Sequence, residues 1–178
     1  MVAIVARHTA ELDEATREAI IQVCFAAHED EDFLRLFSYF PQGGLHFLGY
    51  AADRLVGHAV VTTRWLQPEG LPLLKTGYVD AVSTDPAHQG RGVGSAVMRA
   101  LAETIAADYE IACLETEREG FYARLGWQAW RGPLAGRSAD GLVPTPDQRG
   151  VMILRLPRTP DLDLDGPLTI ECQTGRIW

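Results

Sequence analysis

The sequence predicts a single globular domain of mixed α/β class, residues 1–178. The composition is ordinary for a folded chain, with 47% hydrophobic and 22% charged residues, and a chain of this length buries roughly 70% of its unfolded surface. The periodic segments run in the order strands, helix, strand, helix and strand. That order is typical of a sheet built around one central strand–loop–helix–strand unit.

Local patterns justify the elements of the first half. An acidic start and apolar residues at helical spacing predict a helix at about 13–27. The stretch "LHFLGYAADRLVGHAVVTTRWLQ" predicts two strands joined by a turn at 52–54. A break at "QPEGLP" precedes a further strand at about 74–84.

The second half continues the alternation. Val93, Val97, Leu101 and Ile105 form one apolar stripe of a helix. "YEIACLET" predicts a buried strand, "EREGFYARLGW" a short helix ended by Gly126, and "GVMILRLP" a late strand. No internal repeat interrupts this order.

Charge and composition exclude several classes of protein. A net charge of −8 disfavours a nucleic-acid binder and suits a protein that attracts a cationic substrate. No stretch reaches the roughly 18 apolar residues of a membrane span, and the N-terminus lacks a basic leader. The five histidines are scattered without ligand spacing and the three cysteines form no C-x-x-C pair. We therefore expect a soluble, cytoplasmic protein with no bound metal and neither nucleic acid nor membrane as partner.

The most informative stretch is "HQGRGVGSAV", residues 88–97, which places three glycines and an arginine ahead of a helix. Free backbone N–H groups at a helix start bind phosphate, and glycine allows a close approach. The residues 94–96 are not the Gly-Lys-Ser/Thr of a P-loop, and G-x-G-x-G is not the dinucleotide fingerprint. On these residues alone, a loop that only joins strand to helix stays an alternative.

The wider segment "GYVDAVSTDPAHQGRGVGSAVMRALAE" resembles the central motif of the GCN5-related N-acetyltransferases, Gln/Arg-x-x-Gly-x-Gly/Ala. The resemblance implies that family's central, mixed and largely antiparallel sheet of about six to seven strands flanked by helices. It implies acetyl-CoA as acetyl donor and coenzyme A as product. The residues it assigns to the coenzyme are Val82, Thr84, Gln89, Gly90, Arg91, Gly92, Val93, Gly94 and Ser95.

A second segment, "EGFYARLGW", resembles the part of the same family in which a tyrosine lies close to the coenzyme sulfur. Tyr122 takes that position, where a phenol can protonate the departing thiolate as general acid. Without the glycine loop, a tyrosine of the hydrophobic core would be the better interpretation.

The order of "GGLH", "GYVDAVST", "FYARLGW", "TPDQRG" and a final tryptophan resembles the aminoglycoside 2'-N-acetyltransferases within that superfamily. This resemblance implies acetylation of a 2'-amino group by direct attack on the thioester, antibiotic resistance, and a homodimer. It implies Asp80, Tyr122 and Trp178 as catalytic residues. Because an aminoglycoside carries several ammonium groups, its site should be acidic, and the candidates for binding it are Asp80, Asp147, the α-carboxylate of Trp178 and the run that includes Asp32, with Arg176 also placed at the acceptor.

Two of these positions depart from the subfamily as we know it. Asp80 replaces a longer glutamate, which favours action through a bridging water, and the terminal carboxylate of Trp178 is the competing base. Arg176 replaces an acidic residue, which leaves room for a 2'-amino antibiotic that also carries a carboxylate, such as kasugamycin. For the run "EDED", which includes Asp32, and for Asp147, a solvated surface and a turn are the alternatives.

Two other functions stay open at this point. One is an acetyltransferase for a polyamine or another small metabolic amine, against which "TPD" and the final tryptophan count. The other is a catalytically inactive acetyl-CoA-binding module, against which the intact glycine motif and Tyr122 count.

Overall fold

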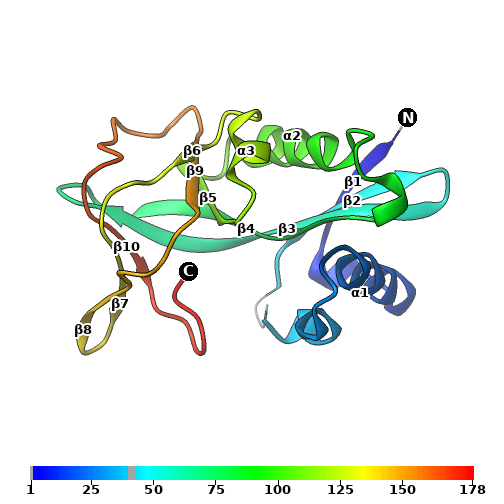
Figure 1. Ribbon diagram of the computed structural model, residues 1–178, viewed down its shortest axis with the longest axis horizontal. Coiled ribbons are helices and arrows are strands. Elements are labelled where there is room, and N and C mark those ends of the chain that lie inside the picture. Colours follow the sequence, from blue (N-terminus) through cyan, green and yellow to red (C-terminus); the bar gives the residue numbers. More distant parts are fainter. Residues whose placement is uncertain (1, 40–42) are drawn as a thin grey trace. The chain divides into compact units, whose positions relative to one another are not determined.

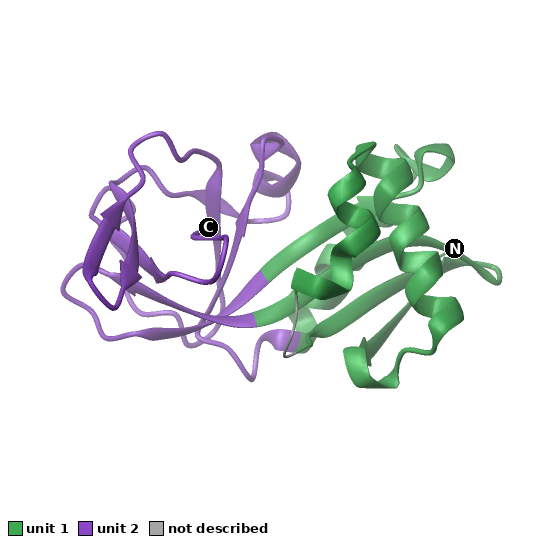
Figure 2. Ribbon diagram, turned by 90° about the horizontal axis from the view of Figure 1, so that it is seen from below, with its two compact units in different colours: residues 1–62, 79–104 green, residues 63–78, 105–178 purple. Residues whose placement is uncertain are grey.

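A computed structural model of the chain describes residues 2–39 and 43–178 (Figure 1). The chain divides into two compact units, Met1–Thr62 with Val79–Thr104, and Thr63–Tyr78 with Ile105–Trp178 (Figure 2). We call them unit 1 and unit 2. Two long strands, β3 (Arg54–Pro68) and β4 (Leu74–Thr84), contribute residues to both units.

The sheet of unit 1 is antiparallel at its N-terminal edge. Strand β1 (Ala3–His8) pairs with β2 (Leu45–Ala51), and β2 pairs with β3. Ala52 adopts a left-handed conformation (φ 52°) in the turn between β2 and β3, where the sequence predicts a turn. Beyond β3 the second half of β4 follows.

Helices cover both faces of this sheet (Figure 1). The helix α1 (Glu14–His28) is capped by Asp13, whose side chain accepts from Thr16 N at 2.8 Å. Short 3-10 segments η1 (Thr9–Glu11), η2 (Glu31–Tyr39) and η3 (Pro86–His88) flank the longer elements. Leu12, Ile20, Val23, Cys24, Leu36, Leu48, Leu55 and Val60 form the core on the α1 face.

The opposite face receives α2 (Val93–Ile105) at close range. Gly49 and Gly57 are paired across β2 and β3. A Cβ atom on Gly57 would come within 2.7 Å of Val93 Cγ1, and one on Gly49 within 3.2 Å of Val97 Cγ2. The two glycines therefore set how closely the helix that follows the glycine loop approaches the sheet.

Unit 2 is built on the remaining strands. The order is β6 (Gln128–Ala129), β9 (Val151–Arg155), β5 (Ile111–Glu115), β4, β3, β10 (Leu168–Glu171), β7 (Leu134–Ser138) and β8 (Gly141–Pro144). The β4–β5 and β10–β7 pairs are parallel, and β5–β9, β6–β9, β10–β3 and β7–β8 are antiparallel. The short helix α3 (Glu119–Ala123) follows β5. Apolar residues of these strands, with Trp130 and Trp178, form the core.

The structure confirms the predicted α/β class and the mixed sheet. The predicted helices and strands at 13–27, 74–84 and 93–105 correspond to α1, β4 and α2. The described residues form ten strands rather than six to seven, because β6, β8 and β10 are only two to four residues long and too short to show an alternation. A single domain over residues 1–178 stays a prediction beside the two units. Within the described chain, no helix has the length and apolarity needed to cross a bilayer.

Candidate functional site

The glycine loop leads from β4 into α2 in unit 1. Gly90 and Gly92 adopt left-handed conformations (φ 71° and 81°), and a Cβ atom on either would meet nothing within 4 Å. Ala96 N donates to Gly92 O at 2.9 Å in the first turn of the helix. The N–H groups ahead of Ala96 therefore belong to the turn that has no acceptor inside a helix. This bare, N–H-rich backbone fits a pyrophosphate, with the exposed Arg91 beside it.

The second half of β4 carries Asp80, Val82 and Thr84. His28 Nε2 lies 3.2 Å from Val82 O and 3.1 Å from Ser83 Oγ, and Gln89 Nε2 donates to Thr84 O at 3.2 Å. Side chains of this protein therefore contact the carbonyls of Val82 and Thr84, the two β4 residues that the family resemblance assigns to the coenzyme. Asp80 is partly exposed.

Tyr122 lies in α3 of unit 2 and is 7% exposed. Its ring packs edge-on against Phe121 and Trp127, with centroids 4.9 and 6.0 Å away. Burial raises the pKa of Tyr122 to about 12, although the charge of Arg118 acts in the opposite direction. The phenol therefore keeps its proton through the neutral pH range, as a proton donor must before it acts.

An acidic pocket of about 660 Å³ opens in unit 2. It is lined by two segments, one after β5 and one between β8 and β9. Its charged residues are four carboxylates and one guanidinium, namely Glu115, Glu117, Glu119, Asp147 and Arg149. The guanidinium turns back on its own loop, because Arg149 Nη1 donates to Pro146 O at 2.6 Å.

Asp147 is the predicted acceptor residue that the structure places in this pocket. The sequence analysis missed the three glutamates, which it included in a strand and a short helix. Thr116 N donates to Gly150 O at 2.9 Å and Glu115 pairs with Val151. The β5–β9 pairing therefore joins the two segments that line the pocket.

The C-terminal residues lie against the core of unit 2. Trp178 is 5% exposed, and its indole N–H donates to Thr145 Oγ1 at 3.1 Å. Arg176 Nε donates to Trp178 O at 2.6 Å, and the Arg176 guanidinium lies 4.9 Å from the centre of the Tyr78 ring. Trp178 thereby contacts a residue that lines the acidic pocket, Thr145.

Asp32 lies on the surface of unit 1, in η2. It forms an exposed ion pair with Arg35 at 3.2 Å, and its N–H donates to Asp30 Oδ1 at 2.9 Å. An exposed pair of this kind contributes little to stability, so Asp32 is open to exchange its partner for another cation.

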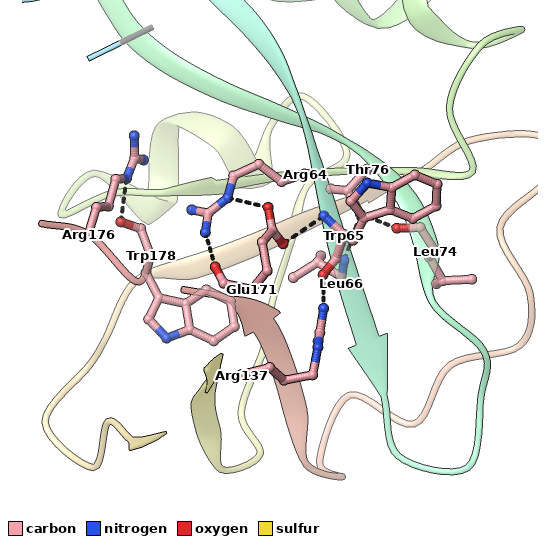
Figure 3. A network of polar contacts seen from close by, with 9 residues as sticks. All are labelled: Arg64, Trp65, Leu66, Leu74, Thr76, Arg137, Glu171, Arg176 and Trp178. Carbon is pink, nitrogen blue, oxygen red and sulfur yellow. Dashed lines mark hydrogen bonds and ion pairs between the residues drawn. The ribbon is translucent and has the colours of Figure 1, made fainter. Parts of the chain in front are cut away.

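The structure also shows a buried charged network that the sequence analysis missed (Figure 3). Arg64, 1% exposed, donates from Nε to Glu171 Oε1 at 3.0 Å and from Nη2 to Glu171 O. Arg137 reaches Trp65 O at 2.5 Å and Thr169 Oγ1 at 2.6 Å. These bonds fix β10 beside β3. Arg64 and Glu171 are 107 residues apart, so no local pattern pairs them.

No group of three or more histidine, cysteine or carboxylate side chains in the described ranges is arranged to hold a metal ion.

Comparisons with known proteins agree on one family. The model of the acetyltransferase (GNAT) domain matches residues 6–130. An aminoglycoside 2'-N-acetyltransferase of Mycolicibacterium fortuitum is 31% identical over 176 residues, covering 96% of this chain and 89% of that protein.

Solved structures show the same fold. The GNAT family N-acetyltransferase YhbS of Escherichia coli in complex with CoA has a TM-score of 0.69 at 11% identity, covering 99% of this chain and 94% of that one. A GNAT family acetyltransferase of Brucella melitensis in complex with acetyl-CoA has a TM-score of 0.61 at 18% identity, covering 93% and 94%.

Proposed function

The chain belongs to the GNAT acetyltransferase family, and we propose that its acceptor is the 2'-amino group of an aminoglycoside. The family uses acetyl-CoA as acetyl donor, and related structures contain CoA or acetyl-CoA. The fold, the enzyme class and the donor are thus given by the family, whereas the acceptor is the proposal.

The acidic pocket of unit 2 is the observation that carries the proposal. Aminoglycosides carry several ammonium groups on a sugar scaffold, and a pocket of about 660 Å³ lies in the range that binds small molecules. Four carboxylates against one guanidinium give the pocket the sign that a polyamine sugar requires. Asp147 lines this pocket and belongs to the "TPD" segment, which resembles a segment of the aminoglycoside 2'-N-acetyltransferases.

On the donor side, the proposal assigns the pyrophosphate to the loop of residues 89–95. The left-handed Gly90 and Gly92 leave their backbone open, and the start of α2 supplies N–H groups. Val82 and Thr84 of β4 are the residues proposed to contact the rest of the coenzyme.

In the proposed reaction Asp80 takes a proton from the amine, through a bridging water, so that the neutral nitrogen attacks the thioester carbonyl carbon. A C–N bond forms and the C–S bond breaks. Tyr122 donates its phenolic proton to the departing thiolate, which leaves as the thiol of coenzyme A, and the second proton that the nitrogen loses as the amide forms restores the phenol. We favour Asp80 over the Trp178 carboxylate as base, because Trp178 O already accepts a charged hydrogen bond from Arg176.

Within this substrate class, Arg176 favours an acceptor that carries a carboxylate besides its amines, as kasugamycin does. The Arg176 guanidinium already donates to Trp178 O, so a substrate carboxylate would pair with it in place of that oxygen, whereas a further ammonium group would be repelled. The proposal also includes antibiotic resistance by a cytoplasmic homodimer, tested by growth of expressing cells on the antibiotic and by light scattering of the purified protein.

Coenzyme A release should be measured with kasugamycin, kanamycin, gentamicin and spermidine, and the acetylated nitrogen located by NMR. We expect transfer to the 2'-amino group of an aminoglycoside, and the highest kcat/KM for kasugamycin. Transfer to spermidine alone would instead establish the small-amine alternative. Acetyl-CoA binding without transfer to any amine would establish the inactive module.

The role of Asp80 is tested by Asp80→Asn. We expect turnover to fall by about 10²-fold, the contribution of a general base, with acetyl-CoA affinity unchanged. A change confined to the KM of the amine would make Asp80 a substrate-holding residue instead.

A further inference from the structure

A continuous chain of hydrogen bonds runs through two buried histidines of unit 1. Thr9 Oγ1 lies 2.9 Å from His46 Nε2, and His46 Nδ1 lies 3.0 Å from His58 Nε2. His58 Nδ1 lies 2.9 Å from Ala81 O. Both imidazoles are fully buried. We call these four residues the histidine chain.

The last acceptor fixes the direction of every bond in the histidine chain. A backbone carbonyl only accepts, so His58 carries its proton on Nδ1 and accepts at Nε2. His46 Nδ1 must then donate to His58, which leaves His46 Nε2 as an acceptor for the Thr9 hydroxyl, whose one proton is shared with Gly44 O at 3.1 Å. Each histidine is thereby held neutral in a single tautomer.

The electrostatics of the two imidazoles agree with this assignment. Burial, followed by the charges of Arg17 and His8, lowers the pKa of His46 to about 4. Burial, followed by the charge of His46, lowers the pKa of His58 to about 3. At neutral pH both rings therefore lack the second proton that would break the chain.

The histidine chain ends on a strained residue. Ala81 adopts a left-handed conformation (φ 50°) inside β4, which an L-residue with a Cβ adopts only when its surroundings hold it. Ser83 Oγ also donates to Ala81 O at 3.2 Å, and Cys24 Sγ lies 4.0 Å from it. The Ala81 carbonyl thus has three side-chain neighbours, His58, Ser83 and Cys24.

The bend separates two residues of the proposed reaction. Asp80 immediately precedes Ala81 and Val82 follows it, so the dihedral angles of Ala81 decide where the Asp80 carboxylate and the Val82 backbone point relative to each other. In regular strand geometry the side chains of Asp80 and Val82, two residues apart, would lie on the same face of the sheet.

We propose that His58 is a positioning residue, which holds the left-handed bend at Ala81 and thereby orients Asp80 and Val82 for acetyl transfer. The inference rests on the proposed function for the roles of these two residues. The bend itself and its support by His58 do not depend on which amine is the acceptor.

Two substitutions of nearly equal size separate positioning from general stability. His58→Asn keeps an N–H donor near the position of Nδ1, whereas His58→Gln places its amide near Nε2 and removes the donor to Ala81 O. We expect His58→Gln to lower kcat by about 10²-fold, as a small misplacement of reacting groups does. His58→Asn should stay within a few fold of the wild type.

A third substitution, Ala81→Gly, makes the test specific to the bend. Glycine adopts positive φ without support, so Ala81→Gly in the His58→Gln background should recover most of the lost kcat. Backbone NMR shifts of residue 81 report the conformation directly: the left-handed signature should weaken in His58→Gln and return in the double variant. Thermal unfolding of all three variants checks that each is folded.

Equal losses in the two His58 variants, or no recovery in the double variant, would overturn the inference. So would a left-handed Ala81 that persists in an inactive His58→Gln. If the wild type acetylates a different amine, the same kinetics are measured with that amine, and only the proposed acceptor is lost. If no amine is acetylated, the NMR shifts decide whether His58 holds the bend.

Discussion

The glycine loop of unit 1 and the acidic pocket of unit 2 bind, in our proposal, opposite charges by opposite means. The loop is one run of seven residues, 89–95, whose binding atoms are main-chain N–H groups. The pocket is lined by two segments, 115–119 and 144–150, whose binding atoms are carboxylates. The loop is built from the backbone of one continuous segment. The pocket is built from side chains of two segments that the fold brings together.

The acidic pocket depends on a backbone contact between its two segments. Gly150 has φ 73°, and a Cβ atom there would lie 1.9 Å from Thr116 O. Only glycine lets the two segments of the pocket approach as closely as Thr116 N and Gly150 O do, at 2.9 Å. Replacing one carboxylate therefore changes the charge of the pocket by a single step. The loop, by contrast, changes only when a side chain is added to its bare backbone.

The largest effect should follow from placing a charge in the loop. Gly92→Asp adds a carboxylate where we place the pyrophosphate, and we expect acetyl-CoA affinity to fall by about 10²-fold or more. Gly92→Asn is the matched control, because it carries the same left-handed strain without the charge. Calorimetry that finds equal affinities for the two variants would show that charge at residue 92 is irrelevant to the coenzyme.

The loop was predictable because its chemistry is local. Glycines at fixed spacing ahead of an apolar helix specify a bare, N-terminal backbone whatever the rest of the chain does, and Tyr122 lies in a similarly contiguous segment. The helices α1 and α2 were predictable because each is long enough to show its period, whereas β5 was predictable as a short, continuous apolar run and β4 from the break that precedes it.

The pocket and the histidine chain were not predictable in the same way. Glu115, Glu117 and Glu119 are ordinary surface residues until the β5–β9 register brings Asp147 beside them. His46 and His58 looked scattered, but the β2–β3 register pairs His46 with Val60 and Leu48 with His58, so the two imidazoles become diagonal neighbours. The sequence offered one signal for this pair of imidazoles, namely a histidine within each of two adjacent apolar strands.

The second largest effect concerns Tyr122, which tests whether unit 2 contributes chemistry as well as charge. Tyr122→Phe removes the phenolic proton and keeps the edge-on packing against Trp127. We expect kcat to fall by about 10²-fold with little change in the KM of either substrate. Stopped-flow measurement of thiol release checks this, and unchanged turnover would make Tyr122 a residue of the core.

A third prediction concerns the histidine chain of unit 1, whose two imidazoles are neutral, in contrast to the charged Arg64–Glu171 network of unit 2. The pKa of His46 is lowered to about 4 and that of His58 to about 3, against about 6.5 in the unfolded chain. Their contribution to stability is therefore complete above about pH 6.5 and is lost as the pH falls below it, because only the unfolded chain takes up protons.

Denaturant unfolding should measure this loss. Between about pH 6.5 and pH 5 the free energy of unfolding should fall by about 2 kcal/mol for each of the two histidines. His58→Asn should remove one of the two contributions, and the slope that remains should be that of His46 alone. A flat profile in the wild type would mean that the imidazoles are not held neutral.

The smallest effect should come from a single carboxylate of the acidic pocket. Asp147 is exposed and shares the pocket with three glutamates, so water and its neighbours screen the loss of its charge. Asp147→Asn should raise the KM for an aminoglycoside about fivefold, with kcat and acetyl-CoA affinity unchanged. Asp140→Asn is the matched control, because it removes the same charge from an exposed turn of unit 2 outside the pocket. If both variants raised KM equally, the acceptor would respond only to the net charge of the protein. An effect confined to Asp147 that shrinks as salt is added would instead locate the cationic acceptor in the pocket.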